Sequence, residues 1–268
     1  MTFMRERIER GEAPLWGAFL SAGSPLMAEM LSRSGFDWLV IDMQHSPLNS
    51  SSELLGMVQA ISLGQSAPFL RAPWKTQFGA IMAALDAGVE GVIIPMLETA
   101  DEAEKISRCF RYPPRGDRSW GPWRVAMTDP DYSPEEGDRR ALCLVQIETR
   151  QAMDNLDAIL AVKDVDGAYI GPQDLSLSHG GGLSWRVTNP VLHDLCQKVL
   201  DACRRHGKIP VAHTADPDDA VQWASDGFQL VNVASDTHLA QQGAVETLKI
   251  LNKGAERTTR PSTTSTGG

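Results

Sequence analysis

Two short apolar segments of this 268-residue sequence each lead directly into a carboxylate. Val145–Ile147 is followed by Glu148, and Tyr169–Gly171 leads through Pro172-Gln173 to Asp174. An ionised group at the end of a buried strand needs a partner of opposite charge, because leaving water is costly for it. Two hard oxygen donors that converge could bind one divalent metal ion. The pattern therefore predicts a metal-dependent enzyme.

Further polar residues lie near the ends of other predicted elements. His45 comes shortly after the strand Trp38–Asp42, and Arg71 ends the strand Pro68–Arg71. A histidine titrates near neutrality and could act as a general base. An arginine offers a fixed charge and a planar fork for a carboxylate or enolate oxygen. Asp86, near the end of a predicted helix, could orient His45 by accepting a ring N–H.

Each of these residues also has a structural interpretation. Glu148 or Asp174 could form an ion pair with Arg71, and Arg71 could instead pair with another buried acid. His45 could be a solvated loop residue, and Asp86 could cap its helix or lie on its surface. A carboxylate at the C-terminal end of a barrel strand is typical of a catalytic site, which favours the chemical interpretation.

Apolar strand-like runs alternate with helix-like segments along the chain. The predicted strands are Leu15–Phe19, Trp38–Asp42, Pro68–Arg71, Gly91–Pro95, Leu142–Glu148, Gly167–Ile170, Ile209–His213 and Leu230–Val233. The predicted helices are Leu26–Arg33, Ser52–Leu63, Gln77–Ala87, Asp101–Phe110, Met153–Leu160, Val191–Arg205, Asp218–Ser225 and Leu239–Leu251. Eight such units predict an α/β fold with a parallel sheet closed into a (β/α)8 barrel. An open doubly wound sheet is the alternative, but no G-x-G-x-x-G follows the first strand.

Two segments depart from this alternation. Residues 111–140 form a long insertion rich in Pro, Gly, Arg and Trp, which is typical of a functional or disordered loop. The chain ends in a Ser/Thr/Gly run, which predicts a disordered tail. We therefore expect one catalytic barrel domain over residues 1–254 and a tail over residues 255–268.

Composition limits the possible classes of protein. The formal net charge is −9, and the absence of a basic cluster disfavours nucleic-acid binding. The four cysteines form no C-x-x-C pair, and the N-terminus lacks the apolar core of a signal peptide. No apolar run reaches the length of a membrane span. We expect a soluble cytoplasmic protein.

Two absences narrow the chemistry. A Schiff-base aldolase needs a lysine near the substrate carbonyl, and only Lys75 follows the C-terminal end of a predicted strand. The segments after the last two strands, His213–Asp216 and Ala234–Asp236, lack a glycine-rich phosphate-binding loop. The substrate is therefore expected to be a carboxylate and not a sugar phosphate.

Four segments together resemble the HpcH/HpaI aldolase family. They are Gly35–His45, Arg111–Gly116, Val145–Arg150 and Ile170–Ser176, and the similarity spans about residues 5 to 252. The resemblance implies a barrel of the phosphoenolpyruvate/pyruvate type and a metal-dependent (class II) pyruvate aldolase. Such enzymes, for example 4-hydroxy-2-oxoheptanedioate and 2-dehydro-3-deoxyglucarate aldolases, cleave or form 4-hydroxy-2-oxo acids through a metal-bound pyruvate enolate and an aldehyde.

The resemblance also implies roles for individual residues. Glu148 and Asp174 would bind Mg, Mn, Co or Zn, and Gln146 would hold a metal-bound water. Arg71 would face the pyruvyl oxygen, while His45, backed by Asp86, would manage the proton of the aldol hydroxyl. The backbone amides of Gln173 and Asp174 would contact the substrate carboxylate. The family is similar in forming homohexamers, as trimers of dimers, with the last helix exchanged between subunits.

The sequence departs from many family members at Gln44, where they have Glu. A subgroup has Gln-His there, and Arg118–Arg124 also resembles that subgroup. Loss of a negative charge beside His45 should lower its basicity or change its water contacts. Trp74 and the loop 115–126, with Trp120 and Trp123, either contact the aldehyde or pack in the core or an interface.

Other functions share the predicted site. The same metal enolate could serve an oxaloacetate decarboxylase, or an enolate-coupling enzyme such as macrophomate synthase. Acyl-CoA lyase activity is disfavoured because no basic cluster suggests CoA binding. A catalytically silent binding or scaffold protein would be favoured if metal binding were absent or if Arg71 were buried in a salt bridge.

Overall fold

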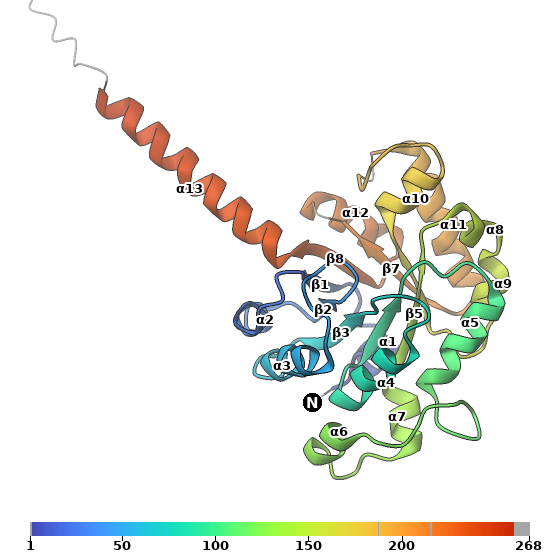
Figure 1. Ribbon diagram of the computed structural model, residues 1–268. Coiled ribbons are helices and arrows are strands. Elements are labelled where there is room, and N and C mark those ends of the chain that lie inside the picture. Colours follow the sequence, from blue (N-terminus) through green and yellow to red (C-terminus); the bar gives the residue numbers. More distant parts are fainter. Residues whose placement is uncertain (1, 187, 215, 260–268) are drawn as a thin grey trace, which may run out of the picture.

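The computed structural model describes residues 2–186, 188–214 and 216–259. Eight parallel strands form a closed barrel in sequence order (Figure 1). The strands are β1 (Leu15–Leu20), β2 (Trp38–Asp42), β3 (Ala67–Arg71), β4 (Gly91–Ile94), β5 (Leu142–Ile147), β6 (Gly167–Ile170), β7 (Ile209–His213) and β8 (Leu230–Ser235). The predicted (β/α)8 barrel is confirmed, and each predicted strand boundary lies within two residues of the observed one.

Helices cover the outside of the barrel. They are α2 (Pro25–Ser32), α3 (Ser51–Ile61), α4 (Phe78–Ala87), α5 (Ala100–Ser107), η1 (Arg108–Phe110), α8 (Arg150–Asp154), α9 (Leu156–Leu160), α10 (Pro172–Ser178), α11 (Pro190–His206) and α12 (Pro217–Asp226). The single helix predicted over Met153–Leu160 is two short helices that meet at Asn155, and α10 was not predicted. The insertion also contains two short helices, α6 (Trp123–Thr128) and α7 (Pro134–Arg140).

Side chains point alternately into and out of the barrel along each strand, so the protein has two separate apolar cores. Outward-facing residues pack against the helices in a large cluster, whereas inward-facing residues such as Trp38, Phe69 and Leu144 fill the barrel. Met4, from the N-terminal helix α1 (Met4–Glu9), joins the inner cluster and closes one end. The four cysteines are buried and unpaired, as expected for small core residues. The open end of the barrel is therefore the C-terminal end of its strands.

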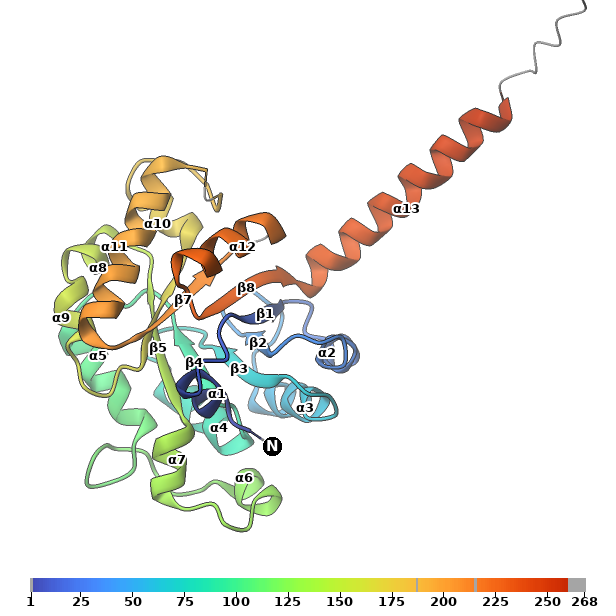
Figure 2. The same cartoon turned by 180° about the vertical axis from the view of Figure 1, so that it is seen from behind.

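The last helix, α13 (Asp236–Thr259), projects away from the barrel (Figures 1 and 2). Its start is fixed because the buried Asp236 carboxylate accepts hydrogen bonds from the Ser21 and Ala22 amides. Its apolar residues Val245, Leu248, Ile250 and Leu251 are exposed. The helix extends past the predicted domain boundary at residue 254, and residues 260–268 of the predicted tail lie outside the described residues. Among the described helices, none combines the length and apolarity that a membrane crossing requires.

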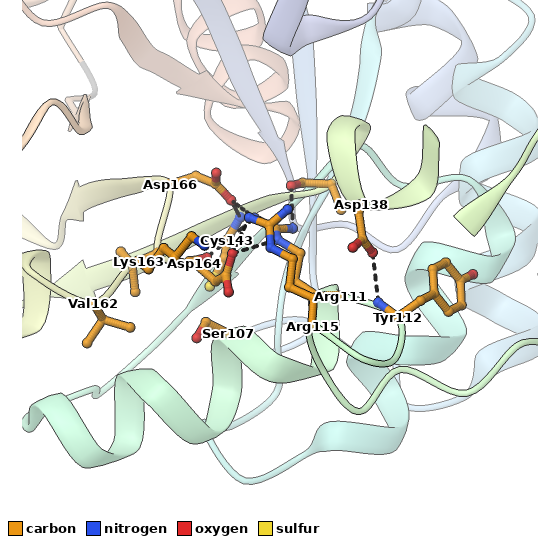
Figure 3. A network of polar contacts seen from close by, with 12 residues as sticks. Ser107, Arg111, Tyr112, Arg115, Asp138, Cys143, Val162, Lys163, Asp164 and Asp166 are labelled. Carbon is orange, nitrogen blue, oxygen red and sulfur yellow. Dashed lines mark hydrogen bonds and ion pairs between the residues drawn. The ribbon is translucent and has the colours of Figure 1, made fainter. Parts of the chain in front are cut away.

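A buried ionic cluster connects the insertion to the N-terminal end of the barrel (Figure 3). Arg111 is 1% exposed, and its guanidinium donates to the Asp166 carboxylate at 2.7 Å and to the Ala141 carbonyl at 3.0 Å. It also lies 3.3 Å from the Asp164 carboxylate. Asp166 accepts a further bond of 2.8 Å from the Cys143 amide at the start of β5. The Arg111–Gly116 motif is therefore structural in this chain and lies at the barrel end opposite the predicted site.

Arg111→Ala should destabilise the protein by about 2–4 kcal/mol, because the fully buried guanidinium and its charge-assisted hydrogen bonds are lost, although Asp166 keeps Arg5 and Asp164 keeps Arg115. The matched control is Arg115→Ala. Arg115 also contacts Asp164 but is 43% exposed, so this change should cost less than about 1 kcal/mol. Urea denaturation of the two variants measures the difference. Equal losses of unfolding free energy would contradict a central role for Arg111.

Candidate active site

Asp42 and Arg71 form an ion pair at the C-terminal ends of β2 and β3. The two residues are register partners, so their side chains leave neighbouring strands at the same level. Arg71 donates from Nε to Asp42 Oδ1 at 3.0 Å and from Nη2 to Oδ2 at 2.6 Å. Burial alone would raise the pKa of Asp42, but the hydrogen bonds and charge of Arg71 outweigh burial and hold this pKa below its ordinary value. The guanidinium is thus fixed in one orientation.

Asp42 also organises the loop that carries His45. Its Oδ1 accepts hydrogen bonds from the amides of Gln44 at 3.0 Å and His45 at 3.2 Å. The His45 side chain is exposed beyond this turn. One carboxylate therefore positions both the arginine and the histidine that the sequence singled out.

Glu148 is 2% exposed at the end of β5, and both of its carboxylate oxygens accept hydrogen bonds. Oε1 accepts from the Met96 amide at 2.6 Å, and Oε2 accepts from the Gln146 side-chain amide. Burial, and to a smaller extent the negative charge of Asp174, raises the pKa of Glu148 to about 7 despite these bonds. A cation near Glu148 would keep this carboxylate ionised at lower pH.

The backbone around Glu148 is specialised. Met96, just beyond β4, has φ +57°, an unusual conformation for a residue with a side chain, and its amide points at Glu148. Gly171, just beyond β6, lies so close that an added Cβ would be 2.6 Å from Glu148 Oε2 and 2.8 Å from Gln146 Nε2. Any side chain at position 171 would therefore displace the carboxylate.

The chemistry of these side chains fits a divalent cation. Asp174 lies exposed in the first turn of α10, close enough to Glu148 to raise its pKa. Gln146 Oε1 is buried and lacks a hydrogen-bond partner among the described residues, so an acceptor atom is available beside Glu148. No group of three His, Cys, Asp or Glu side chains suited to a metal occurs in the part of the chain that the structure describes. Two carboxylates alone would leave coordination positions open for water and substrate.

The other predicted site residues have fewer contacts with the groups described above. Gln173 is exposed beside Asp174 in the first turn of α10, where backbone N–H groups have no acceptor within the helix. Trp74 is 43% exposed in the loop after β3. Asp86 does not contact His45 through any hydrogen bond of the described residues, and its Oδ1 instead accepts from Arg118 at 2.9 Å. Within one chain, the predicted His45–Asp86 pair is not formed.

Two inward-facing residues near the site were missed from the sequence. Tyr169 of β6 and His213 of β7 lie 2.6 Å apart, phenol oxygen to Nδ1. His213 ends its strand, and that position was the available signal.

Known proteins resemble this chain over most of its length. A family model described as HpcH/HpaI aldolase/citrate lyase matches residues 15–242. The chain is 35% identical over 255 residues to the 2-keto-3-deoxy-L-rhamnonate aldolase of Shigella boydii serotype 4 (strain Sb227), with 93% of each covered. A solved HpcH/HpaI aldolase/citrate lyase family protein from Burkholderia cenocepacia J2315 has a TM-score of 0.85 and 28% identity, with 93% of this chain and 98% of that chain covered. Macrophomate synthase, at 24% identity, has a TM-score of 0.84 with 96% and 92% covered, which shows a shared fold.

The raised pKa of Glu148 predicts how stability depends on pH. Between its ordinary pKa of 4.5 and about 7, the folded state binds more protons than the unfolded state. Stability of the metal-free protein should therefore fall as pH rises through this window, by up to about 3 kcal/mol. Glu148→Gln should remove this loss and raise the urea midpoint in EDTA near pH 8, with little effect near pH 5.

Glu90 provides the matched control. It lies at the opposite end of the barrel, and burial raises its pKa to about 7 as well. Glu90→Gln should give a similar pH-dependent gain but leave stabilisation by Mn²⁺ intact, whereas Glu148→Gln should abolish that stabilisation. Undiminished stabilisation by Mn²⁺ in the Glu148 variant would contradict a cation at this carboxylate.

Proposed function

The chain belongs to the HpcH/HpaI aldolase/citrate lyase family and is an aldolase, and we propose that it cleaves and forms 4-hydroxy-2-oxo acids by way of a pyruvate enolate. The observation that carries this proposal is the buried Glu148, with its raised pKa, beside the Asp174 charge at the open end of the barrel. The 35% identical relative is named for a 2-keto-3-deoxy acid, which is the same general class of substrate.

A divalent cation would be held by Glu148 and Asp174, with Gln146 contacting its water. When bound, the cation polarises the keto oxygen of the substrate and stabilises the negative charge of the enolate. Two carboxylates do not select strongly among Mg, Mn, Co and Zn, so the proposal names the class and not the element. The first-turn amides of Gln173 and Asp174 would donate hydrogen bonds to the substrate carboxylate at the positive end of α10.

Arg71 would stabilise the enolate oxygen with a guanidinium that is already oriented. Its Nε and Nη2 are used by Asp42, while Nη1 has no recorded acceptor among the described residues. The guanidinium also lies over the Phe19 ring, 4.8 Å from its centroid. We expected a silent binding protein if Arg71 were buried in a salt bridge. Arg71 does form a salt bridge with Asp42, but the bridge leaves Nη1 of its guanidinium available for substrate. Family membership supports the enzymatic interpretation.

His45 would exchange the proton of the 4-hydroxyl as the C3–C4 bond breaks, directly or through water. Its exposed ring and tethered backbone suit a group that meets substrate at the barrel mouth. No hydrogen bond joins Asp86 to His45 among the described residues of one chain, so Asp86 would orient this ring from a second copy, through the oxygen that Arg118 does not use. Trp74, exposed after β3, would contact the aldehyde portion.

We propose the assembly as a homohexamer, a trimer of dimers, with α13 exchanged between subunits. The projection of α13 from the barrel and its exposed apolar residues support this, because an isolated helix of this kind gains stability by packing. Oxaloacetate decarboxylation and enolate coupling would use the same enolate. No residue of the site favours either of these two reactions specifically, and the experiment below distinguishes oxaloacetate decarboxylation from aldol cleavage.

Glu148→Ala and Asp174→Ala should each lower retro-aldol turnover by at least about a thousandfold, because transition-state charge stabilisation is lost. Each change should also abolish Mn²⁺ binding, measured by calorimetry on the same preparations. Glu9→Ala, an exposed carboxylate at the other end of the barrel, is the control and should change neither quantity. Retention of turnover or of Mn²⁺ binding in either site variant would overturn the assignment. Oxaloacetate decarboxylation without aldol cleavage by the unaltered protein would replace it with the decarboxylase.

A further inference from the structure

Three neighbouring strands carry polar side chains on the inner face of the barrel, where branched apolar residues usually dominate. They are Tyr169 on β6, His213 on β7 and Asn232 on β8. Tyr169 and His213 pack against Phe19, with ring centroids 6.3 and 5.3 Å away. His213 and Asn232 are register partners, so they lie side by side on the same face. We call these three residues the polar wall.

The polar wall borders the site described above. Tyr169 is the register partner of Gln146 on one side and of Val211 on the other. His213, two residues beyond Val211, therefore lies at the level of Gly171, the residue that abuts Glu148. The Phe19 ring contacts both His213 and Arg71: its centroid lies 5.3 Å from that of the His213 ring and 4.8 Å from the Arg71 guanidinium carbon. His213 thus faces the chamber that contains Glu148 and Arg71.

Both members of the Tyr169–His213 pair are neutral near pH 7. Burial lowers the pKa of His213 to about 4, and the positive charge of Arg71 lowers it further while Asp42 opposes this. Burial raises the pKa of the Tyr169 phenol well above its ordinary value. The only recorded acceptor for the phenol proton among the described residues is His213 Nδ1. The phenol therefore donates to Nδ1, which leaves the proton on Nε2.

His213 Nε2–H is then a neutral donor with no recorded protein acceptor in the described part of the chain. His213 is not fully enclosed although burial dominates its pKa, and it ends β7 at the mouth of the barrel, where a ligand can reach it. Beside it, the side-chain amide of Asn232 is 0% exposed, and neither its oxygen nor its nitrogen has a described hydrogen-bond partner. Buried polar atoms are nearly always satisfied, so Asn232 indicates a polar ligand or water on this side.

We propose that His213 determines aldehyde specificity by donating a hydrogen bond from Nε2 to a hydroxyl group of the aldehyde, and that Tyr169 positions its ring. The inference rests on the proposed function, in which the pyruvate half is already bound by Glu148, Asp174 and Arg71. The polar wall supplies polar groups near this end of the barrel that the pyruvate half does not use. A neutral donor suits a hydroxyl group better than a carboxylate, which would draw a charged partner. The enzyme therefore prefers hydroxylated aldehydes.

The test compares glyceraldehyde with propanal in aldol addition to pyruvate, because the two differ only in hydroxyl groups. His213→Leu should reduce the ratio of kcat/KM for glyceraldehyde over propanal by about 10- to 100-fold, mainly through KM for the aldehyde. Tyr169→Phe should reduce it in the same direction by about threefold, since the ring loses its orienting bond. His213→Gln keeps an N–H donor and should recover part of the preference.

Deuterium exchange of the pyruvate methyl group, measured with Mg²⁺ on the same preparations, separates the possible failures. Unchanged exchange with a reduced ratio supports the inference. An unchanged ratio in His213→Leu, or an equal loss for both aldehydes, overturns it, as does loss of exchange, which would place His213 on the pyruvate half. If His213→Leu does not fold, the ratios of His213→Gln and Tyr169→Phe decide. If the unaltered protein does not exchange the methyl protons of pyruvate, the proposed function is wrong, and the inference that rests on it is wrong as well.

Discussion

The site depends on a carboxylate that is buried without a permanent positive partner. Among the described residues, the hydrogen bonds to Glu148 come from neutral donors, the Met96 amide and the Gln146 side chain; the charge of Asp174 nearby raises its pKa and the more distant charge of Arg71 opposes this only weakly. Neutral hydrogen bonds do not offset the loss of hydration, so its pKa rises. The surrounding chain accommodates this group through a strained backbone at Met96 and a glycine at position 171. Such an arrangement costs stability in the isolated protein, and the proposed cation would offset this cost.

The barrel positions the other polar side chains of the site. Parallel strands in register bring Asp42 beside Arg71, and Asp42 then fixes both the guanidinium and the turn before His45. The opposite end of the barrel is held by a separate buried cluster around Arg111, which keeps the insertion attached to β5 and β6. Stability and chemistry are thereby assigned to different ends of one fold, as is general for such barrels.

The sequence predicted the strands and the two carboxylates because both signals are local: apolar runs, and an acid where a run ends. It did not predict partners that depend on register or distant segments. The pairing of Asp42 with Arg71 needs the β2–β3 register, and the Asp86 contact comes from Arg118 in an insertion that had been predicted as a loop. Backbone donors such as the Met96 amide cannot be predicted from the types of residue in the sequence. Tyr169 and His213 lie 44 residues apart in sequence, so their contact follows only from the closed barrel.

We propose that Glu148 and Asp174 would hold a divalent cation, which would supply the charge stabilisation that a pyruvate enolate needs. The most direct measurement is the loss of the pyruvate methyl proton signal in deuterium oxide, followed by NMR with metal-stripped protein before and after addition of Mg²⁺. The account predicts negligible exchange without metal and rapid exchange once Mg²⁺ is present. Absence of exchange in folded, metal-loaded protein, or equal exchange in EDTA, would contradict it.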